Sequence, residues 1–259
     1  MKIKAVVIVS ALLLLQLSPP AAVAQRRGGG ELQRLRQEVQ ELKEGQQALM
    51  EQLLELKEML GAGRAQPAAS KKSVLSTEGM PFKGESTARL VLIEFSDYQC
   101  PFCAQHARET FPKLDRDYVK TGKLKYVFGD LPLEEIHPDA LRAAKAAACA
   151  SDQGKYWEMH DQLFKSQNAL GQGELSLHAQ ALGLEVLPFQ RCLFSDKHEV
   201  RIRHARDVAA SVGVSGTPTF LVGLASPDGS QVEVLKVLVG IQSYANFKAV
   251  LDQLMAASE

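Results

Sequence analysis

Two cysteines stand two residues apart in the stretch SDYQCPFCA, and a proline directly follows the first of them. The pair is Cys100 and Cys103. This spacing suits three kinds of site: an inert structural disulfide, half of a metal site, or a redox pair. In a redox pair one thiolate attacks a disulfide and the second thiol resolves the mixed disulfide that forms. The surrounding residues and the cellular compartment decide among these three.

The elements expected around the motif favour redox chemistry. The apolar run LVLIEF, residues 90–95, is typical of a buried strand, and residues 101–119 have helical character. A cysteine at a helix start faces unpaired backbone N–H groups and the positive end of the helix dipole, both of which stabilise a thiolate. We therefore expect Cys100 to be the nucleophile and Cys103 to be the resolving thiol.

A metal site is the weaker interpretation of the motif. Structural zinc usually has four ligands. The nearest additional candidate is His106, three residues after Cys103, and we expect its side chain to lie on the helix surface. The sequence thus predicts neither a metal nor any other cofactor.

The first residues are typical of a secretory signal. A basic start is followed by an apolar run over residues 5–17 and a small-x-small ending, which predicts cleavage after Ala24. The run is shorter than the roughly 20 residues needed to span a bilayer. We expect a periplasmic or secreted protein, in a compartment where thiols tend to pair. Without Lys2 and Lys4 the 30 basic residues fall to 28 against 30 acidic ones, a balance that gives no support to a nucleic-acid partner.

A heptad pattern precedes the globular part. Positions spaced alternately by three and four residues are apolar, except that Gln46 occupies one of them. The apolar residues are Leu32, Leu35, Val39, Leu42, Leu49, Leu53, Leu56 and Leu60. We expect a coiled-coil helix over residues 31–60 that joins copies of the chain, with an undetermined number of strands. The alternative, an amphipathic helix packed on its own domain, normally shows a wider apolar stripe. Residues 61–72, GAGRAQPAASKK, are expected to form a flexible linker.

The remaining chain alternates strands and helices, which predicts an α/β domain over residues 73–259. Helical patterns fill residues of about 130–212, and these interrupt the strands. The expected strands and final helix are residues 90–95, 123–128, 219–222 and 232–239, then 243–255.

This order of motifs resembles a known family. A strand LVLIEFSDYQ, then CPFC at a helix start, a long helical insertion and finally GTPTF at residues 216–220 resemble the DsbA-like family of the thioredoxin fold. The resemblance covers residues of about 75–257. It implies a thioredoxin-like fold with an inserted helical subdomain, thiol–disulfide exchange on protein substrates, and a membrane redox partner. The predicted coil is not part of the basic family pattern and looks like the oligomerising stalks of periplasmic disulfide isomerases.

The resemblance also implies roles for further residues. Glu94 matches a buried acid that exchanges protons with the resolving cysteine, although an edge-strand glutamate facing water is the alternative. Thr217 and Pro218 match a cis-proline loop beside the cysteines, where the backbone of the residue before proline pairs with substrate. Phe102 lies between the cysteines, where the family tunes its redox poise. Because phenylalanine brings no positive charge, we expect a less oxidising couple than a histidine would give.

The second pair of cysteines lacks the CxxC spacing. In an exported chain Cys149 and Cys192 most simply form one disulfide across the insertion, as in some members of the resembled family, and two buried free thiols are the alternative. His137, Trp157 and His160 are expected to pack or cap the insertion.

Among the possible reactions of such an oxidoreductase, the sequence favours oxidation and isomerisation of substrate disulfides about equally, and reduction comes third. A different class, an oligomeric scaffold with an inactive redox head, is disfavoured because both cysteines, the acid and the proline are present.

Overall fold

The computed structural model describes residues 33–34, 36–41, 45, 73–229 and 231–257. The chain divides into two units, residues 1–69 and 70–259. In the first unit the described residues are helical, and Arg34 Nε donates to Glu38 Oε1 at 3.0 Å. The predicted signal at residues 1–24, the linker at 61–72 and most of the predicted coil lie outside the described residues. Among the helices of the described residues, none has the length and apolar character needed to cross a membrane.

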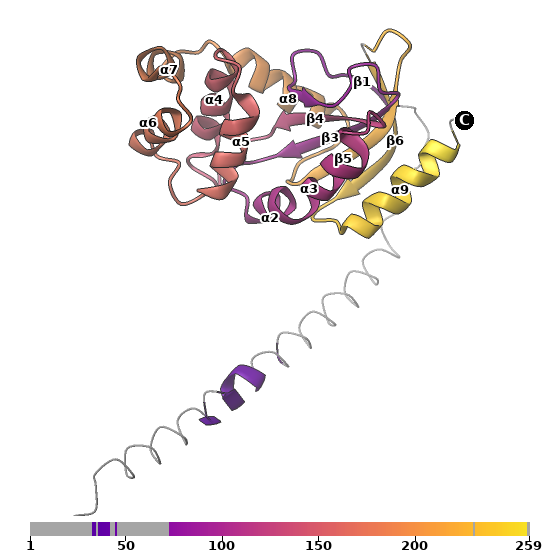
Figure 1. Ribbon diagram of the computed structural model, residues 1–259, viewed down its shortest axis with the longest axis horizontal. Helices are drawn as coiled ribbons and strands as arrows, with labels where there is room; N and C mark the ends of the chain where they lie inside the picture. Colours follow the sequence, from indigo (N-terminus) through magenta and orange to yellow (C-terminus); the bar gives the residue numbers. More distant parts are fainter. Residues whose placement is uncertain (1–32, 35, 42–44, 46–72, 230, 258–259) are drawn as a thin grey trace, which may run out of the picture. The chain divides into compact units, whose positions relative to one another are not determined.

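The second unit is built on a six-stranded mixed sheet (Figure 1). Its strands are β1 (Ser73–Ser76), β2 (Phe82–Lys83), β3 (Leu90–Ser96), β4 (Leu124–Asp130), β5 (Thr219–Ala225) and β6 (Gln231–Val239), in the spatial order β1-β6-β5-β3-β4-β2. Strand β3 runs parallel to β4 and antiparallel to β5. Every residue of β3 is buried, as expected for a continuous apolar run in the middle of a sheet. The short edge strands β1 and β2 were not predicted.

Side-chain alternation along β3 divides the core of the sheet into two layers. Leu90 and Leu92 pack with residues of the helices after the cysteine motif and of α9 (Tyr244–Ala256). Val91, Ile93 and Phe95 pack with α8 (Glu199–Ser211) on the opposite face. Glu94 has the parity of Leu92, so β3 directs its carboxyl group toward the layer that holds the motif.

The helix after the motif is continuous but irregular. It begins as α2 (Pro101–Gln105), continues as a wider π turn over His106–Thr110 and as α3 (Phe111–Leu114), and ends in a second π turn over Asp115–Val119. Pro112 has no N–H to donate to the carbonyl four residues earlier, and the first π turn ends two residues before it. The predicted helix over residues 101–119 is therefore present, with a local widening that the pattern did not indicate.

Five helices form the insertion between β4 and β5, and they pack around their own core. They are α4 (Ala140–Ser151), α5 (Tyr156–Lys165), α6 (Gln172–Ala181), α7 (Val186–Leu193) and α8. Figure 1 shows α4 to α7 gathered beside one end of the sheet. A disulfide joins Cys149 in α4 to Cys192 in α7, with the two Cα atoms 5.7 Å apart. The predicted α/β fold with an inserted helical subdomain is confirmed.

Candidate active site

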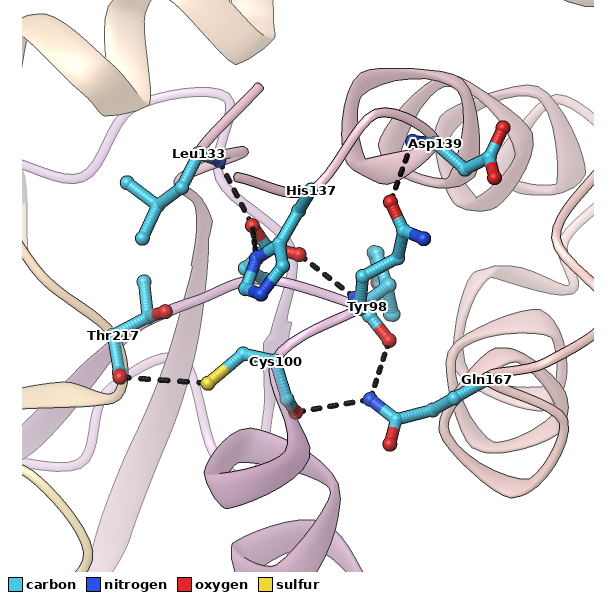
Figure 2. A network of polar contacts seen from close by, with 9 residues as sticks. Tyr98, Cys100, Leu133, His137, Asp139, Gln167 and Thr217 are labelled. Carbon is cyan, nitrogen blue, oxygen red and sulfur yellow. Dashed lines mark hydrogen bonds and ion pairs between the residues drawn. The ribbon is translucent and has the colours of Figure 1, made fainter. Parts of the chain in front are cut away.

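The turn between β3 and α2 is fixed by a buried carboxylate. Asp97 is 1% exposed. Its Oδ1 accepts from the backbone N–H of Gln99 at 2.7 Å, and its Oδ2 accepts from the backbone N–H of Leu133 and contacts His137 Nδ1, both at 2.8 Å (Figure 2). The side chain therefore joins the turn to the segment that leads into α4.

A glutamine from the insertion holds the same turn from the other side. Gln167 follows α5, and its Nε2 donates to the backbone carbonyl of Tyr98 at 2.7 Å and to that of Cys100 at 2.9 Å (Figure 2). Gln99 Oε1 in turn accepts from the backbone N–H of Asp139 at 2.5 Å. These contacts fix the point at which the helix begins.

Cys100 caps the N-terminus of α2, at the helix start as predicted, and Pro101 is the first residue within the helix. Hydrogen bonding from the Cys103 thiol is the largest influence on the Cys100 sulfur and lowers its pKa, and the backbone N–H groups of Phe102 and Cys103 act in the same direction. Burial opposes them, but the pKa still falls from an ordinary 9.0 to about 6. At neutral pH the Cys100 thiol is thus predominantly a thiolate.

Cys103 lies in the opposite situation. Its side chain is fully buried, and burial raises the pKa of the thiol well above its ordinary value. The nearby Cys100 sulfur and the Glu94 carboxyl raise it further. Both cysteines are free thiols in the structure. One helical turn therefore separates a thiol that ionises readily from one that retains its proton.

The predicted proline loop lies beside this pair. The Thr217–Pro218 peptide bond is cis, and the backbone carbonyl of Thr217 lies 3.5 Å from Cys100 Sγ (Figure 2). Thr219 Oγ1 closes the loop by donating to the Gly216 carbonyl at 2.7 Å. The side chain of Phe102, in contrast, is 56% exposed. The loop, the ionisable sulfur and an exposed aromatic ring thus occur together.

Glu94 is buried beneath the motif and does not face water, since β3 is a central strand. Tyr126 on the neighbouring strand β4 donates its hydroxyl to Glu94 Oε2. Burial raises the pKa of the carboxyl from 4.5 to about 7, although the Tyr126 hydrogen bond opposes this shift. A carboxyl group in this range can gain or lose a proton near neutral pH.

The prediction that His106 lies on the helix surface was wrong. Its side chain is fully buried, packs on the rings of Phe220 and Phe247 with centroids 4.5 and 5.5 Å away, and has Nε2 3.5 Å from Glu94 Oε2. Burial lowers the pKa of its imidazole to about 3. Near pH 6, therefore, both Glu94 and His106 are neutral, and their contact is not an ion pair.

The sequence contained one signal for this burial that we did not weigh. Residues three apart on a helix share a face, so His106 lies on the buried face of Cys103. Asp97 also carried a signal, because a short acid directly after a buried strand is a frequent turn former. Gln167 and Tyr126 carried none, since they reach the site only through the tertiary fold. His137 also contacts the active-site turn through Asp97, whereas His160 lies in the buried aromatic cluster with Trp157.

Comparison with known proteins agrees with this geometry. Residues 76–237 match the profile of the family described as thioredoxin. The chain belongs to this thioredoxin family. Among solved structures it is similar to alpha-DsbA1 of Wolbachia pipientis, at 23% identity over 70% of this chain and 92% of that one with a TM-score of 0.58. It is also similar to oxidised BdbD of Bacillus subtilis, at 22% identity over 70% of this chain and 96% of that one with a TM-score of 0.59. These likenesses show a thioredoxin fold of the DsbA-like type.

A further similarity is to part of a much longer protein. Over 158 residues the chain is 37% identical to a protein named Na(+)/H(+) antiporter NhaA 1 of Salinispora arenicola, a match that covers 61% of this chain and 24% of that protein. The chain thus spans about a quarter of the length of this curated relative.

The low pKa of Cys100 predicts a titration that can be measured directly. The ultraviolet absorbance of the thiolate in the reduced protein should fall on acidification with a midpoint at about pH 6. Cys103→Ala should move this midpoint upward, because the thiol that most stabilises the sulfur is lost. Cys100→Ala should abolish the transition, and a midpoint near pH 9 in the parent protein would contradict this assignment.

The raised pKa of Glu94 predicts a stability that depends on pH. Below pH 4.5 the carboxyl is protonated in both folded and unfolded chains; as pH rises toward 7 the unfolded chain releases its proton first, so folding is progressively disfavoured. The unfolding free energy of Glu94→Gln minus that of the parent should therefore increase by about 3 kcal/mol from pH 4 to pH 8. Urea unfolding at both pH values measures this gain.

The control for that experiment is Glu109→Gln, which changes an exposed carboxyl on the helix that follows the motif. Its unfolding free energy should differ from the parent by the same amount at both pH values. If the unfolding free energy of Glu94→Gln also differed from the parent by the same amount at both pH values, the buried carboxyl would have an ordinary pKa.

Proposed function

We propose that this chain is a thiol–disulfide oxidoreductase that acts on protein substrates, with Cys100 as nucleophile and Cys103 as resolving thiol. The observation that carries the proposal is the opposite ionisation of the two sulfurs: the pKa of Cys100 is lowered to about 6, and that of Cys103 is raised. The thiolate is the attacking species and also the better leaving group. An inert structural disulfide has no need of this asymmetry.

In the oxidising direction, a substrate thiolate attacks Cys100 Sγ of the Cys100–Cys103 disulfide. The S–S bond breaks, a mixed disulfide forms, and Cys103 leaves with the electron pair and takes a proton from the Glu94 carboxyl. A second substrate thiolate then attacks the substrate sulfur and releases Cys100 as a thiolate. The substrate loses two electrons, and the enzyme pair gains them.

In the isomerising direction no net electrons move. The Cys100 thiolate attacks a wrong disulfide of the substrate and releases one of its cysteines as a thiolate. Another substrate thiolate then attacks the substrate sulfur of the mixed disulfide and frees Cys100 again. Should this step stall, Glu94 as a carboxylate accepts the Cys103 proton, so that Cys103 can attack Cys100 Sγ and release the substrate.

The surroundings of Cys100 suit an extended polypeptide. Pro218 has no N–H, so the backbone of Thr217 is the one that can pair with a substrate strand beside the sulfur. The exposed Phe102 ring offers an apolar contact next to the same atom. We infer that Thr217 and Phe102 contact the residues flanking a substrate cysteine, and that Cys149–Cys192 is structural under oxidising conditions.

The remaining parts of the proposal concern location and assembly. Export through residues 1–24 would place the cysteines in an oxidising compartment. Oligomerisation through residues 31–60 would bring several heads together, as disulfide isomerisation favours. A membrane redox protein would then reoxidise or reduce the pair, depending on the reaction that dominates.

Ribonuclease refolding tests the function. The mature protein should restore activity to reduced ribonuclease, to scrambled ribonuclease, or to both, and Cys100→Ala should abolish either effect because no other residue supplies the nucleophile. Equal activity of the parent and Cys100→Ala would contradict the proposal. A chain without residues 31–60 separates the roles: loss of isomerisation alone would indicate that the coil creates an isomerase, whereas oxidation by both chains without isomerisation would indicate an oxidase.

A further inference from the structure

Three potential metal ligands converge at the second cysteine pair, away from the CxxC motif. Cys149, Cys192 and His198 each offer one ligand atom, and these atoms all lie within 4.8 Å of one another. In the part of the chain that the structure describes, no other group of three His, Cys, Asp or Glu side chains meets this geometry. The three residues come from the last turns of α4 and α7 and from the residue directly before α8.

A carboxylate already orients the histidine. His198 Nε2 lies 3.2 Å from Asp152 Oδ1 and 3.3 Å from Asp152 Oδ2. Asp152 is fixed at the end of α4, and Lys197 Nζ lies 2.8 Å from its Oδ2. In the tautomer that carries its proton on Nε2, His198 donates to Asp152, and the lone pair of Nδ1 is then the one available to a metal. A ligating histidine in a metalloprotein is typically held in this way by a carboxylate on its other nitrogen.

We propose that reduction of the Cys149–Cys192 disulfide converts this cluster into a zinc site, with Cys149, Cys192 and His198 as ligands and Asp152 as the residue that positions His198. Two thiolates and an imidazole suit Zn²⁺, and three protein ligands leave a fourth position for water. Sulfurs on a tetrahedral zinc lie about 3.8 Å apart. Reduction breaks the S–S bond and lets the two sulfurs separate toward that spacing, with a ligand atom of His198 already within 4.8 Å of both.

The chemistry balances with a dithiol as the reductant. A thiolate of the dithiol attacks one sulfur of the disulfide, and its second thiol completes the exchange, so that the dithiol becomes a disulfide and the cluster gains two electrons and two protons. Zn²⁺ then displaces the two thiol protons. Because the intact disulfide offers no thiolate, metal binding and the disulfide exclude each other.

The two states would preserve the same connection in the fold. The disulfide closes a loop with a sequence separation of 43 between α4 and α7. Zinc held by both sulfurs would close that loop as well and would add α8 through His198. A reduced chain would thus keep its insertion assembled, while the metal blocks the thiolates from other reactions.

Cobalt binding tests the site separately from the redox activity proposed above. In a full-length Cys100→Ala/Cys103→Ala chain, the remaining two cysteines are Cys149 and Cys192. After reduction with a phosphine and in the absence of oxygen, titration with Co²⁺ should give one equivalent with thiolate charge-transfer bands and intense visible bands of tetrahedral cobalt. Added Zn²⁺ should displace it, and the oxidised chain should show none of these bands.

Variants distinguish a built site from a pair of thiols that binds metal adventitiously. Asp152→Asn should weaken Zn²⁺ binding about 10- to 100-fold, and His198→Ala should weaken it further. His204→Ala, within helix α8, should leave it unchanged. An absence of cobalt bands in the reduced Cys100→Ala/Cys103→Ala chain would overturn the proposal. Equal affinity for Zn²⁺ in that chain with and without His198→Ala would overturn it as well.

Circular dichroism covers the case in which reduction loosens the insertion. Zn²⁺ should then restore the helical signal of the reduced Cys100→Ala/Cys103→Ala chain. At the same concentration it should fail to restore the signal when His198→Ala is added to that chain. Failure to restore the signal of the Cys100→Ala/Cys103→Ala chain would count against the site.

Discussion

The turn between β3 and α2 is the constraint on which the active site depends. A buried carboxylate at Asp97 and the amide of Gln167 bind its backbone from two sides, and both sets of contacts reach into the segments around the helical insertion. Since the end of β3 is fixed within the sheet, this turn determines that the helix begins at Cys100. The lowered pKa of that sulfur comes first from the Cys103 thiol one helical turn away, and then from the backbone N–H groups of the helix start. The insertion therefore holds the turn that carries Cys100.

Desolvation shifts the pKa values of the groups beneath the motif in opposite directions. It raises the pKa values of Cys103 and Glu94, and it lowers that of His106. All three groups are consequently neutral near pH 6, which is how a well-packed interior accommodates ionisable side chains. Of the groups at the motif, Cys100 alone has enough hydrogen bonds to overcome its burial. In the proposed exchange reaction, this difference between neighbouring sulfurs would direct attack to Cys100.

Much of the fold could be predicted from local patterns. The run LVLIEF indicated a central strand and the CPFC motif indicated the helix start, whereas the loop at GTPTF that approaches Cys100 was implied by the family resemblance. His106 was misjudged because polarity was given more weight than its spacing from Cys103. Tyr126 and Gln167 could not be assigned, since Tyr126 reaches Glu94 across a strand pair and Gln167 reaches the active-site turn from the turn after α5. Strands β1 and β2 are too short to show a period of two.

The central claim is that exchange begins at Cys100 and that Cys103 resolves it. Trapping tests this most directly: a Cys103→Ala chain is mixed with a peptide containing a disulfide, and the products are mapped by mass spectrometry. The account predicts a stable mixed disulfide on Cys100, and no comparable adduct on Cys103 when Cys100→Ala is treated in the same way. Adducts of similar yield on either cysteine would contradict the claim that the fold distinguishes the two sulfurs.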